Sequence, residues 1–510
     1  MTPSGERTPN GPANALARAR ALEESGRYAD ALAELAQAHK AAPQDPAILA
    51  AQSRCLSALG RFGAAMDAAR DAVASAPRSA EAHYLAGFAA ENLGDLAMAR
   101  TAYEAAATLA PRMADAVARL AALAARRGDW PEARSRAVRA LALAPGHAAA
   151  QFALVMADMA DDRFAAAETR ARRIAGDTAY QPQIRANALN FLGDALDRLD
   201  RTDEAFAAYA QSNAALKNLH RAQFEHPDVP SGLGTTRRLL AEFEALGARD
   251  WAAADAPPSP AGGHVFILGF PRSGTTLLAE ILAGHPGAHV SDERNLLGDA
   301  LRHFTGRPGG LRALAEADSA ALAPWRERYW ARARAEGAAE GLLIDKSPFH
   351  TLHLPLIAKL FPQAKILFAL RDPRDVVFAC FRRLFALNPF LYECLTLDGT
   401  AALYDAVMRL GEAYRASVPL SLLEVRNETL IADPGAEVAR LCTFLGIAPN
   451  ASMTDFARRT ERRAIASPQS AGLAAGVSAA GQGQWRRYAQ HLEPIMPIIA
   501  PWVRRFGYGA

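Results

Sequence analysis

One stretch decides the fold of the second half of this 510-residue chain, residues 264–282, HVFILGFPRSGTTLLAEIL. Its first seven residues are apolar, with β-branched and aromatic side chains, and predict a buried strand. Leucine and isoleucine recur at helical spacing from Leu277 onward, which predicts a helix with one apolar face. The turn from Gly269 to Thr276 therefore places backbone N–H groups, an arginine and hydroxyls at a helix N-terminus. Such a turn is suited to a phosphate-like anion.

The turn resembles a P-loop with one departure. Gly269 and Gly274 have P-loop spacing, but Thr275 stands where a P-loop has its lysine, and the cation is Arg272 within the loop. An enzyme that transfers a γ-phosphoryl group would lose a main phosphate contact without that lysine. We therefore expect the loop to bind a 5′-phosphate without γ-phosphoryl transfer. A P-loop kinase or NTPase is the alternative that the loop alone leaves open.

Length and composition limit the classes of protein. A chain of 510 residues with 50% apolar and 22% charged residues predicts at least two globular domains. The net charge of +3 is too small to indicate nucleic-acid binding. The four cysteines are scattered without a CxxC pair, so neither a disulfide framework nor a metal site is expected, and a reducing, cytoplasmic location fits best. No signal-like N-terminus and no run of about 18 apolar residues occurs, so we expect no membrane partner.

An internal period organises the first half. Glycines recur every 34 residues at 26, 60, 94 and 128, and prolines and alanines keep the same interval at 43, 77, 111 and 145 and at 31, 65, 99 and 133. This is the tetratricopeptide period, in which glycine ends a first helix and proline follows the second. The expected copies span 10–43, 44–77, 78–111, 112–145, a fifth at 146–180 and a sixth at 185–216. Asp162 takes the glycine place in the fifth.

The repeats predict an α-helical solenoid over residues 10–216. Its surface would hold a peptide, a protein partner or a second copy of the chain, with a purely structural spacer as the alternative. Residues 217–262, rich in turns and ending in a Pro/Gly linker, are expected to connect it to the domain at 263–510.

In the second domain, strands are predicted to alternate with helices, as in a parallel α/β sheet. The expected strands lie within 264–270, 341–347, 364–375 and 421–430. Ligands of such sheets bind beyond the carboxyl ends of the strands. The segments that follow carry Arg272, Lys346, Arg371 and Arg374, which predicts a cationic site at this edge.

Two segments carry a family resemblance. PRSGTT (271–276) resembles the 5′-phosphosulfate loop of sulfotransferases that use 3′-phosphoadenosine 5′-phosphosulfate (PAPS), and LFALRDPRDVVFACFRR (367–383) resembles their 3′-phosphate segment. Together with the repeats, they resemble tetratricopeptide-repeat sulfotransferases, whose catalytic domain is similar to that of tyrosylprotein sulfotransferases. The resemblance implies a PAPS-dependent transferase that needs no metal, and the catalytic domain points among such enzymes to a protein-tyrosine sulfotransferase. Its acceptor would be a peptide, a glycan or a small molecule.

The resemblance also implies roles for individual residues. The 5′-phosphosulfate would be held by Arg272, Ser273, Gly274, Thr275 and Thr276, with Arg272 also acting in catalysis. Lys346 would offset charge on the leaving phosphate. Glu293 would be the base for the acceptor hydroxyl, with His350 as the competing base and Asp292 expected to point elsewhere. Arg371 would bind the 3′-phosphate, with Arg374 and Asp375 as a supporting pair, and Ser467 would contact phosphate.

The sequence departs from the family pattern at three places. Ala379 replaces a serine that touches the 3′-phosphate, Asn427 replaces a tyrosine that lies against adenine, and Asn295 replaces an acceptor-side arginine. The first two leave open a third alternative, a repeat scaffold with an inactive nucleotide fold. The segment ending in Trp485 and Tyr488 is expected to close over the nucleotide, with both aromatic rings packing within the protein.

Overall fold

The computed structural model describes residues 12–249, 251, 259–338, 341–455 and 481–509. Within them, the residues up to Arg170 form one compact unit and those from Ala171 onward form a second. The second unit therefore includes the helices that follow the fifth repeat as well as the sheet.

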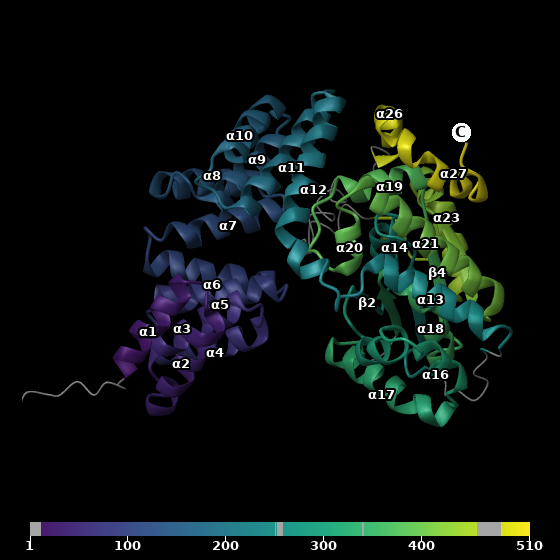
Figure 1. The fold of residues 1–510 in the computed structure, drawn as a ribbon, viewed down its shortest axis with the longest axis horizontal. Coiled ribbons are helices and arrows are strands. Elements are labelled where there is room, and N and C mark those ends of the chain that lie inside the picture. The colour runs from purple at the N-terminus through teal and green to yellow at the C-terminus, as the bar shows by residue number, and fades with distance from the viewer. Residues whose placement is uncertain (1–11, 250, 252–258, 339–340, 456–480, 510) are drawn as a thin grey trace, which may run out of the picture. The chain divides into compact units, whose positions relative to one another are not determined.

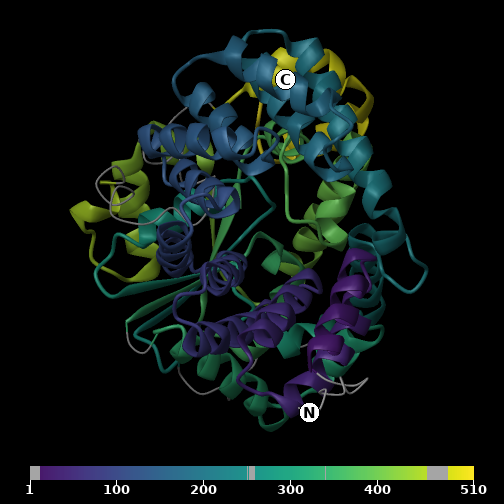
Figure 2. The same ribbon diagram turned by 90° about the vertical axis from the view of Figure 1, so that its left-hand side faces the viewer.

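The first unit is a stack of helix pairs that follow one another in chain order (Figures 1 and 2). Its helices are α1 (Pro12–Glu24), α2 (Tyr28–Ala41), α3 (Pro46–Ala58), α4 (Phe62–Ser75), α5 (Ala80–Asn92), α6 (Leu96–Leu109), α7 (Ala114–Arg126), α8 (Trp130–Leu143), α9 (Ala148–Ala160) and α10 (Phe164–Gly176). Each of the first four pairs turns at a glycine with positive φ, at 26, 60, 94 and 128. The alanines at 31, 65, 99 and 133 are completely buried, which allows the paired helices to approach closely. The predicted solenoid is confirmed.

Aspartate takes the glycine position in the later pairs. Asp162 between α9 and α10 has φ 55°, and Asp200 between α11 (Pro182–Arg198) and α12 (Thr202–Phe224) has φ 61°. Aspartate is one of the few residues that tolerates this left-handed conformation. The helix–turn–helix geometry thus persists where the sequence period is degraded.

The second unit contains a five-stranded parallel sheet with strand order β2-β3-β1-β4-β5. The strands are β1 (Gly263–Leu268), β2 (Ala288–Asp292), β3 (Leu342–Lys346), β4 (Lys365–Leu370) and β5 (Ser421–Arg426). The strand β2 was not among those predicted. It is short, only partly buried and at the edge of the sheet, so it lacks the apolar run that marks the central strands.

Helices cover both faces of this sheet. Val265 and Ile267 of β1 pack with α14 (Thr275–Leu282) and α23 (Pro434–Leu445). Phe266 and Leu268 face the opposite way and pack with α13 (Gly232–Leu246), α18 (Leu354–Leu360) and α21 (Leu397–Ser417). This alternation is the period of two of a strand that is buried on both faces. The α/β domain is confirmed.

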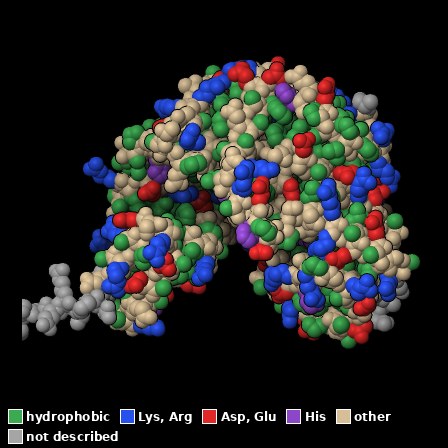
Figure 3. All heavy atoms as spheres, in the orientation of Figure 1, with side chains coloured by type: hydrophobic (Ala, Val, Ile, Leu, Met, Phe, Trp, Pro, Cys, Tyr) green, Lys and Arg blue, Asp and Glu red, His purple; other side chains and the backbone are tan. Residues whose placement is uncertain are grey.

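Two surface properties accompany the fold. Cationic and anionic side chains are interspersed on the face seen in Figure 3, in keeping with the small net charge. Within the described residues, no helix combines the length and apolar character needed to cross a membrane.

Candidate active site

The carboxyl ends of the strands place the predicted site residues along one sheet edge. In strand order, Asp292 ends β2, Lys346 ends β3, the loop 269–274 follows β1, and Arg371 follows β4. Asp292 and Lys346 are register partners, as are Lys346 and Ile267 of β1. Parallel pairing therefore brings residues from distant parts of the chain to a single edge.

Strained backbone marks two of these residues. Among the described residues, the non-glycine positions with positive φ are Asp162, Asp200, Arg272 (70°) and Glu293 (53°). The first two lie in helix-pair turns. The other two lie in the segments for which a catalytic role was predicted, and such conformations are enriched at functional sites.

The loop 269–274 ends at Gly274, which has a φ of 99° and directly precedes α14. A Cβ at this position would lie 2.5 Å from Oδ1 of Asn427. Glycine is therefore required both by the backbone and by the close approach of Asn427. The residue that replaces the family's tyrosine thus packs against the phosphate loop.

Three arginines give this edge its charge. Nε of Arg272 and Nε of Arg371 are buried and have no hydrogen-bond partner in the described part of the chain. Nη1 of Arg371 donates to the carbonyl oxygen of Arg272 at 3.1 Å. Burial, followed by the positive charges of Arg383 and Arg371, lowers the pKa of Arg272 to about 10, which leaves it charged at neutral pH. Burial also lowers the pKa of Arg383. Clustered, desolvated cations favour an anionic ligand.

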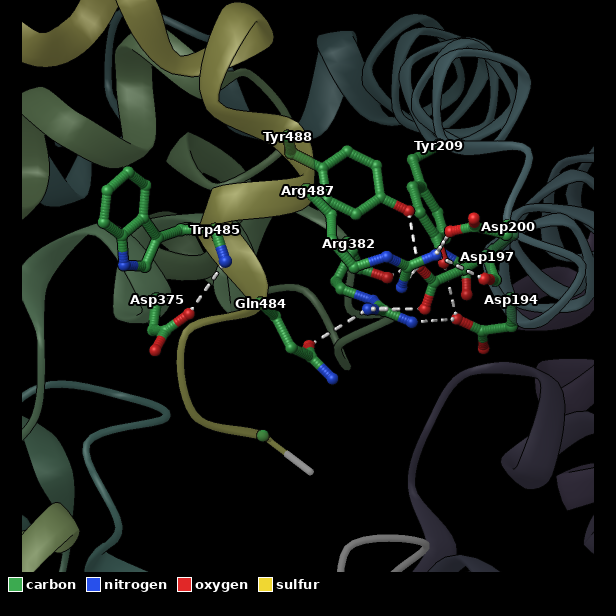
Figure 4. Close-up of polar contacts among 12 residues, drawn as sticks. Asp194, Asp197, Asp200, Tyr209, Asp375, Arg382, Gln484, Trp485, Arg487 and Tyr488 are labelled. Atoms are coloured by element: carbon green, nitrogen blue, oxygen red, sulfur yellow. Dashed lines mark hydrogen bonds and ion pairs between the residues drawn. The ribbon is translucent and has the colours of Figure 1, made fainter. Parts of the chain in front are cut away.

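Arg371 and Asp375 hold a segment from the C-terminal part of the chain. Nη2 of Arg371 donates to the carbonyl oxygen of Gly481. The carboxylate of Asp375 accepts the N–H of Gly483 at 2.6 Å and that of Trp485 at 3.0 Å (Figure 4). Burial raises the pKa of Asp375, and these two N–H bonds oppose the rise. The segment that was expected to close over the nucleotide therefore touches the predicted 3′-phosphate arginine.

The predicted pair of Arg374 and Asp375 does not form. Arg374 instead donates to Asp372 at 2.8 Å and lies 3.8 Å over the ring of Trp485. Asp372 also caps helix α19 (Pro373–Phe381) by accepting the N–H of Arg374. The guanidinium fork of Arg374 matches the carboxylate two residues earlier, which leaves Asp375 for the backbone of the C-terminal segment.

Lys346 is buried between two carboxylates. Its side chain is 3% exposed, and Nζ lies 2.9 Å from Oε1 of Glu293 and forms a second ion pair with Asp292. Burial acts to lower the pKa of Lys346, but Asp292 and Glu293 raise it above its ordinary value. The expectation that Asp292 would point elsewhere is wrong, because both carboxylates contact the lysine. Both are more than half exposed, so a substrate can reach them from solvent.

The competing base, His350, is buried in the core. Its Nε2 lies 3.0 Å from Oδ1 of Asp345, whose other oxygen accepts the hydroxyl of Tyr329 at 3.1 Å. Tyr329 in turn contacts Nε2 of His264 at 2.8 Å. His350 is thus engaged by Asp345 inside the protein and is only 4% exposed. The geometry favours Glu293 over His350 as the group that meets an acceptor.

The remaining predicted positions have different outcomes. Ala379 is buried, and the neighbouring Cys380 donates to the carbonyl oxygen of Pro271 at 3.3 Å, which ties α19 to the phosphate loop. Ser273 and Thr275 lie buried in that loop. Ser467 lies outside the described residues.

Sequence reasoning missed Arg383 and the role of Asp375. Within the described residues, the guanidinium of Arg383 has no hydrogen bond or ion pair, although it lies close enough to Arg272 to lower the pKa of that group. The signal for Arg383 was the second arginine of the pair that ends the predicted 3′-phosphate segment. Asp375 carried no comparable signal, because its partners are backbone N–H groups more than 100 residues away.

Comparisons with known proteins agree with this geometry. Residues 264–450 match the model described as the sulfotransferase family, and residues 22–87 and 80–113 match tetratricopeptide-repeat models. The chain joins tetratricopeptide repeats to a sulfotransferase-family domain. The match to the sulfotransferase family includes the loop 269–274, both carboxylates at Lys346 and the arginines in and beside α19.

Two of three similar curated proteins are named protein-tyrosine sulfotransferases. An uncharacterized protein of Aquifex aeolicus is 23% identical over 47% of this chain and 32% of its own length. A putative protein-tyrosine sulfotransferase of Caenorhabditis briggsae is 26% identical over 36% of this chain and 65% of its own. Protein-tyrosine sulfotransferase 1 of Danio rerio is 26% identical over 48% of this chain and 72% of its own length. The chain thus spans less than two thirds of the first two relatives.

Proposed function

We propose that the sulfotransferase domain transfers the sulfuryl group of PAPS to a hydroxyl acceptor. One observation carries this proposal: Arg272 and Arg371 keep buried Nε–H groups that have no partner among the described residues. A buried donor without a partner costs free energy, and a bound phosphate or sulfate oxygen would satisfy it. The tetrahedral oxygens of a 5′-phosphosulfate and a 3′-phosphate suit the planar guanidinium fork.

Donor binding would divide between two ends of the site. The loop from Arg272 to Thr276 would take the 5′-phosphosulfate, and Arg371 with Arg383 would take the 3′-phosphate. The arginine pair would compensate for the serine that Ala379 replaces. Asn427 packs against the loop, so adenine would be held by groups other than a tyrosine at that position.

The proposed step is an in-line displacement at sulfur. The acceptor oxygen forms the new O–S bond while the bond from sulfur to the 5′-phosphate oxygen breaks. Glu293 takes the proton of the acceptor hydroxyl, and the electron pair of the broken bond remains on the leaving phosphate. Arg272 and Lys346 supply positive charge beside that phosphate.

We further propose peptide tyrosine as the acceptor. Two relatives of the sulfotransferase domain bear the name protein-tyrosine sulfotransferase, and a repeat solenoid is suited to hold a peptide. Asn295 in place of an acceptor-side arginine would shift the sequence preference of that peptide. A cytoplasmic location and the absence of a metal requirement stay predictions.

The test is transfer from labelled PAPS to tyrosine peptides, with labelled ATP in a parallel reaction. We expect sulfated peptide from PAPS and no phosphorylated product from ATP. Binding and turnover of ATP without transfer from PAPS would favour the kinase or NTPase alternative, and binding of neither donor would favour an inactive scaffold. Transfer to a sugar or small hydroxyl compound alone would overturn only the acceptor assignment.

Two neighbouring carboxylates give a matched pair of variants. Glu293→Gln and Asp292→Asn each remove one ion pair of Lys346 from an exposed side chain. If Glu293 is the base, kcat falls by about 10²–10⁴-fold in the first variant, and by far less in the second. Equal losses in the two variants would mean that both act only by holding Lys346. Full activity of Glu293→Gln would remove it from the mechanism.

A further inference from the structure

Helix α11 ends in a group of acidic residues whose negative charges are unfavourable at a helix C-terminus. Asp194, Asp197 and Asp200 recur every three residues and lie at one helix terminus (Figure 4). Carboxylates at a helix C-terminus oppose the helix dipole, and they also repel one another at this spacing. Unlike Asp158 of α9, which pairs with Arg134 and Arg163 of the repeats, the carboxylates of α11 have their arginine partners outside the repeats. Their compensation comes from cations elsewhere in the second unit.

Asp197 is the centre of that compensation. It is 5% exposed, and its Oδ1 accepts Nη1 of Arg487 at 2.7 Å and the hydroxyl of Tyr488 at 2.7 Å. Its Oδ2 pairs with Arg382 at 3.2 Å. Its backbone carbonyl accepts Nη2 of Arg487 at 2.8 Å. One buried carboxylate therefore binds two guanidinium groups and a phenol, so its removal would leave buried charge unpaired.

Asp194 and Asp200 flank this centre without replacing it. Asp194 accepts Nη2 of Arg382 at 2.9 Å, and Asp200 accepts Nη2 of Arg487 at 2.8 Å. Their side chains are 33% and 88% exposed, against 6% for Asp197. Solvent screens exposed pairs strongly, so the buried carboxylate carries most of the interaction.

The residues held by Asp197 continue directly into the segment at the donor site. Gln484–Tyr488 form one 3₁₀ turn, so Tyr488 and Trp485 belong to a single short element. At its other end the N–H groups of Gly483 and Trp485 bond to Asp375, and Gly481 bonds to Arg371. The element is thus fixed at two ends, by α11 and by the start of α19.

We propose that Asp197 is a positioning residue of the donor site. By holding Arg487 and Tyr488 it fixes the backbone of Gly481–Trp485 over Arg371 and Asp375. It also holds Arg382, the neighbour of Arg383. The assignment of this edge to the donor 3′-phosphate rests on the proposed function, whereas the mechanical link from α11 to Gly481 does not. The last helix pair is therefore part of the enzyme's nucleotide site and not only of the repeat array.

The test uses the full chain with Asp197→Asn, which keeps the shape and removes the charge. We expect the amide hydrogens of Gly483 and Trp485 to exchange roughly tenfold faster or more, the loss typical of one hydrogen bond to a charged group. We expect KM for PAPS to rise by a similar factor, with kcat at saturating PAPS and KM for the acceptor unchanged. Tyr488→Phe, which removes only the hydroxyl, should give the same pattern with a smaller change.

Asp203→Asn is the matched control. Asp203 begins the neighbouring helix, is 70% exposed, and accepts a bond from His491 at 2.8 Å, beyond the 484–488 turn. The Asp203→Asn variant should leave the amide exchange of Gly483 and Trp485 and the KM for PAPS at the wild-type values. Unchanged exchange at Gly483 and Trp485 in both the Asp197→Asn and Tyr488→Phe variants would overturn the proposal. So would a general acceleration of exchange across the second unit with KM for donor and acceptor rising together. If the protein does not use PAPS, the exchange measurement still decides the mechanical link.

Discussion

The third and sixth helix pairs share one packing contact, a glycine against a buried tyrosine ring, but the polar partners around that tyrosine differ. In α5–α6, a Cβ at Gly87 would lie 2.7 Å from the ring of Tyr103, and in α11–α12, a Cβ at Gly193 would lie 2.5 Å from the ring of Tyr209. Both tyrosines are completely buried and stand 16 residues after their glycine. The two pairs therefore have the same apolar contact.

The polar partners of the two tyrosines differ. The hydroxyl of Tyr103 donates to Glu91 of its own helix pair at 2.8 Å. The hydroxyl of Tyr209 donates at 2.8 Å to Asp194, which also accepts Arg382 of the sulfotransferase domain. The carboxylate that accepts the tyrosine hydroxyl thus pairs with arginines of the next repeat helix, α7, in the third pair, and with Arg382 beyond the repeats in the sixth. A few charged side chains suffice to join the sixth helix pair to Arg382 and Arg487 of the second unit.

The largest expected difference between the pairs comes from their arginines. Arg382→Met would remove the buried cation that Asp194 and Asp197 share, and we expect a loss of about 3–5 kcal/mol in the stability of the second unit. Arg119→Met, in α7, removes a contact of 3.8 Å to Glu91 from a side chain that is 32% exposed, and should cost about 0–1 kcal/mol. Calorimetry that resolves the two units would measure both. Equal losses of stability in the two variants would mean that the arginine contacts of α11–α12 contribute no more than an arginine contact between repeats.

The glycines provide a medium-sized test. Gly87→Ala and Gly193→Ala each force a methyl group against a tyrosine ring, which should destabilise the respective unit by about 1–3 kcal/mol. Only Gly193→Ala should also raise KM for PAPS, because it displaces the helix that carries Asp197. A rise in KM with Gly87→Ala of similar size would contradict the division between the pairs.

The smallest expected effect is that of the hydroxyl groups. Tyr103→Phe and Tyr209→Phe each remove one hydrogen bond to a carboxylate. We expect each to lower the free energy of unfolding by about 1 kcal/mol, as measured by urea unfolding. Asp194 keeps Arg382 in the second variant, so activity should stay close to that of the wild type. A large loss of activity with Tyr209→Phe would show that Asp194, not Asp197, is the dominant contact.

Much of the fold follows from local signals. The 34-residue period predicts the helix pairs because each copy repeats the same turn glycine and buried alanine. The apolar runs predict four strands, and the charged residues that follow them mark the functional edge. The strand β2 was not predicted because an edge strand needs no continuous apolar run, and this stretch was singled out only for Asp292 and Glu293.

The site shows where local signals end. Arg272, Lys346 and Arg371 follow from the strand-end rule and the family motifs. The pairing of Arg374 with Asp372, the second carboxylate at Lys346 and the bonds of Asp375 depend on side-chain directions that spacing does not encode. The role of Asp197 joins residues 290 positions apart, and no periodicity predicts such a contact.

The uniform left-handed turns at Gly26, Gly60, Gly94 and Gly128 have a consequence for the length of the array. Each copy begins and ends in the same geometry, so a whole 34-residue copy is a natural unit of duplication or deletion. The helix pair α11–α12 has no such freedom, because its acidic residues are matched to individual arginines. Evolution or design can therefore change the number of 34-residue copies in the first unit without changing the contacts that α11 makes with Arg382 and Arg487.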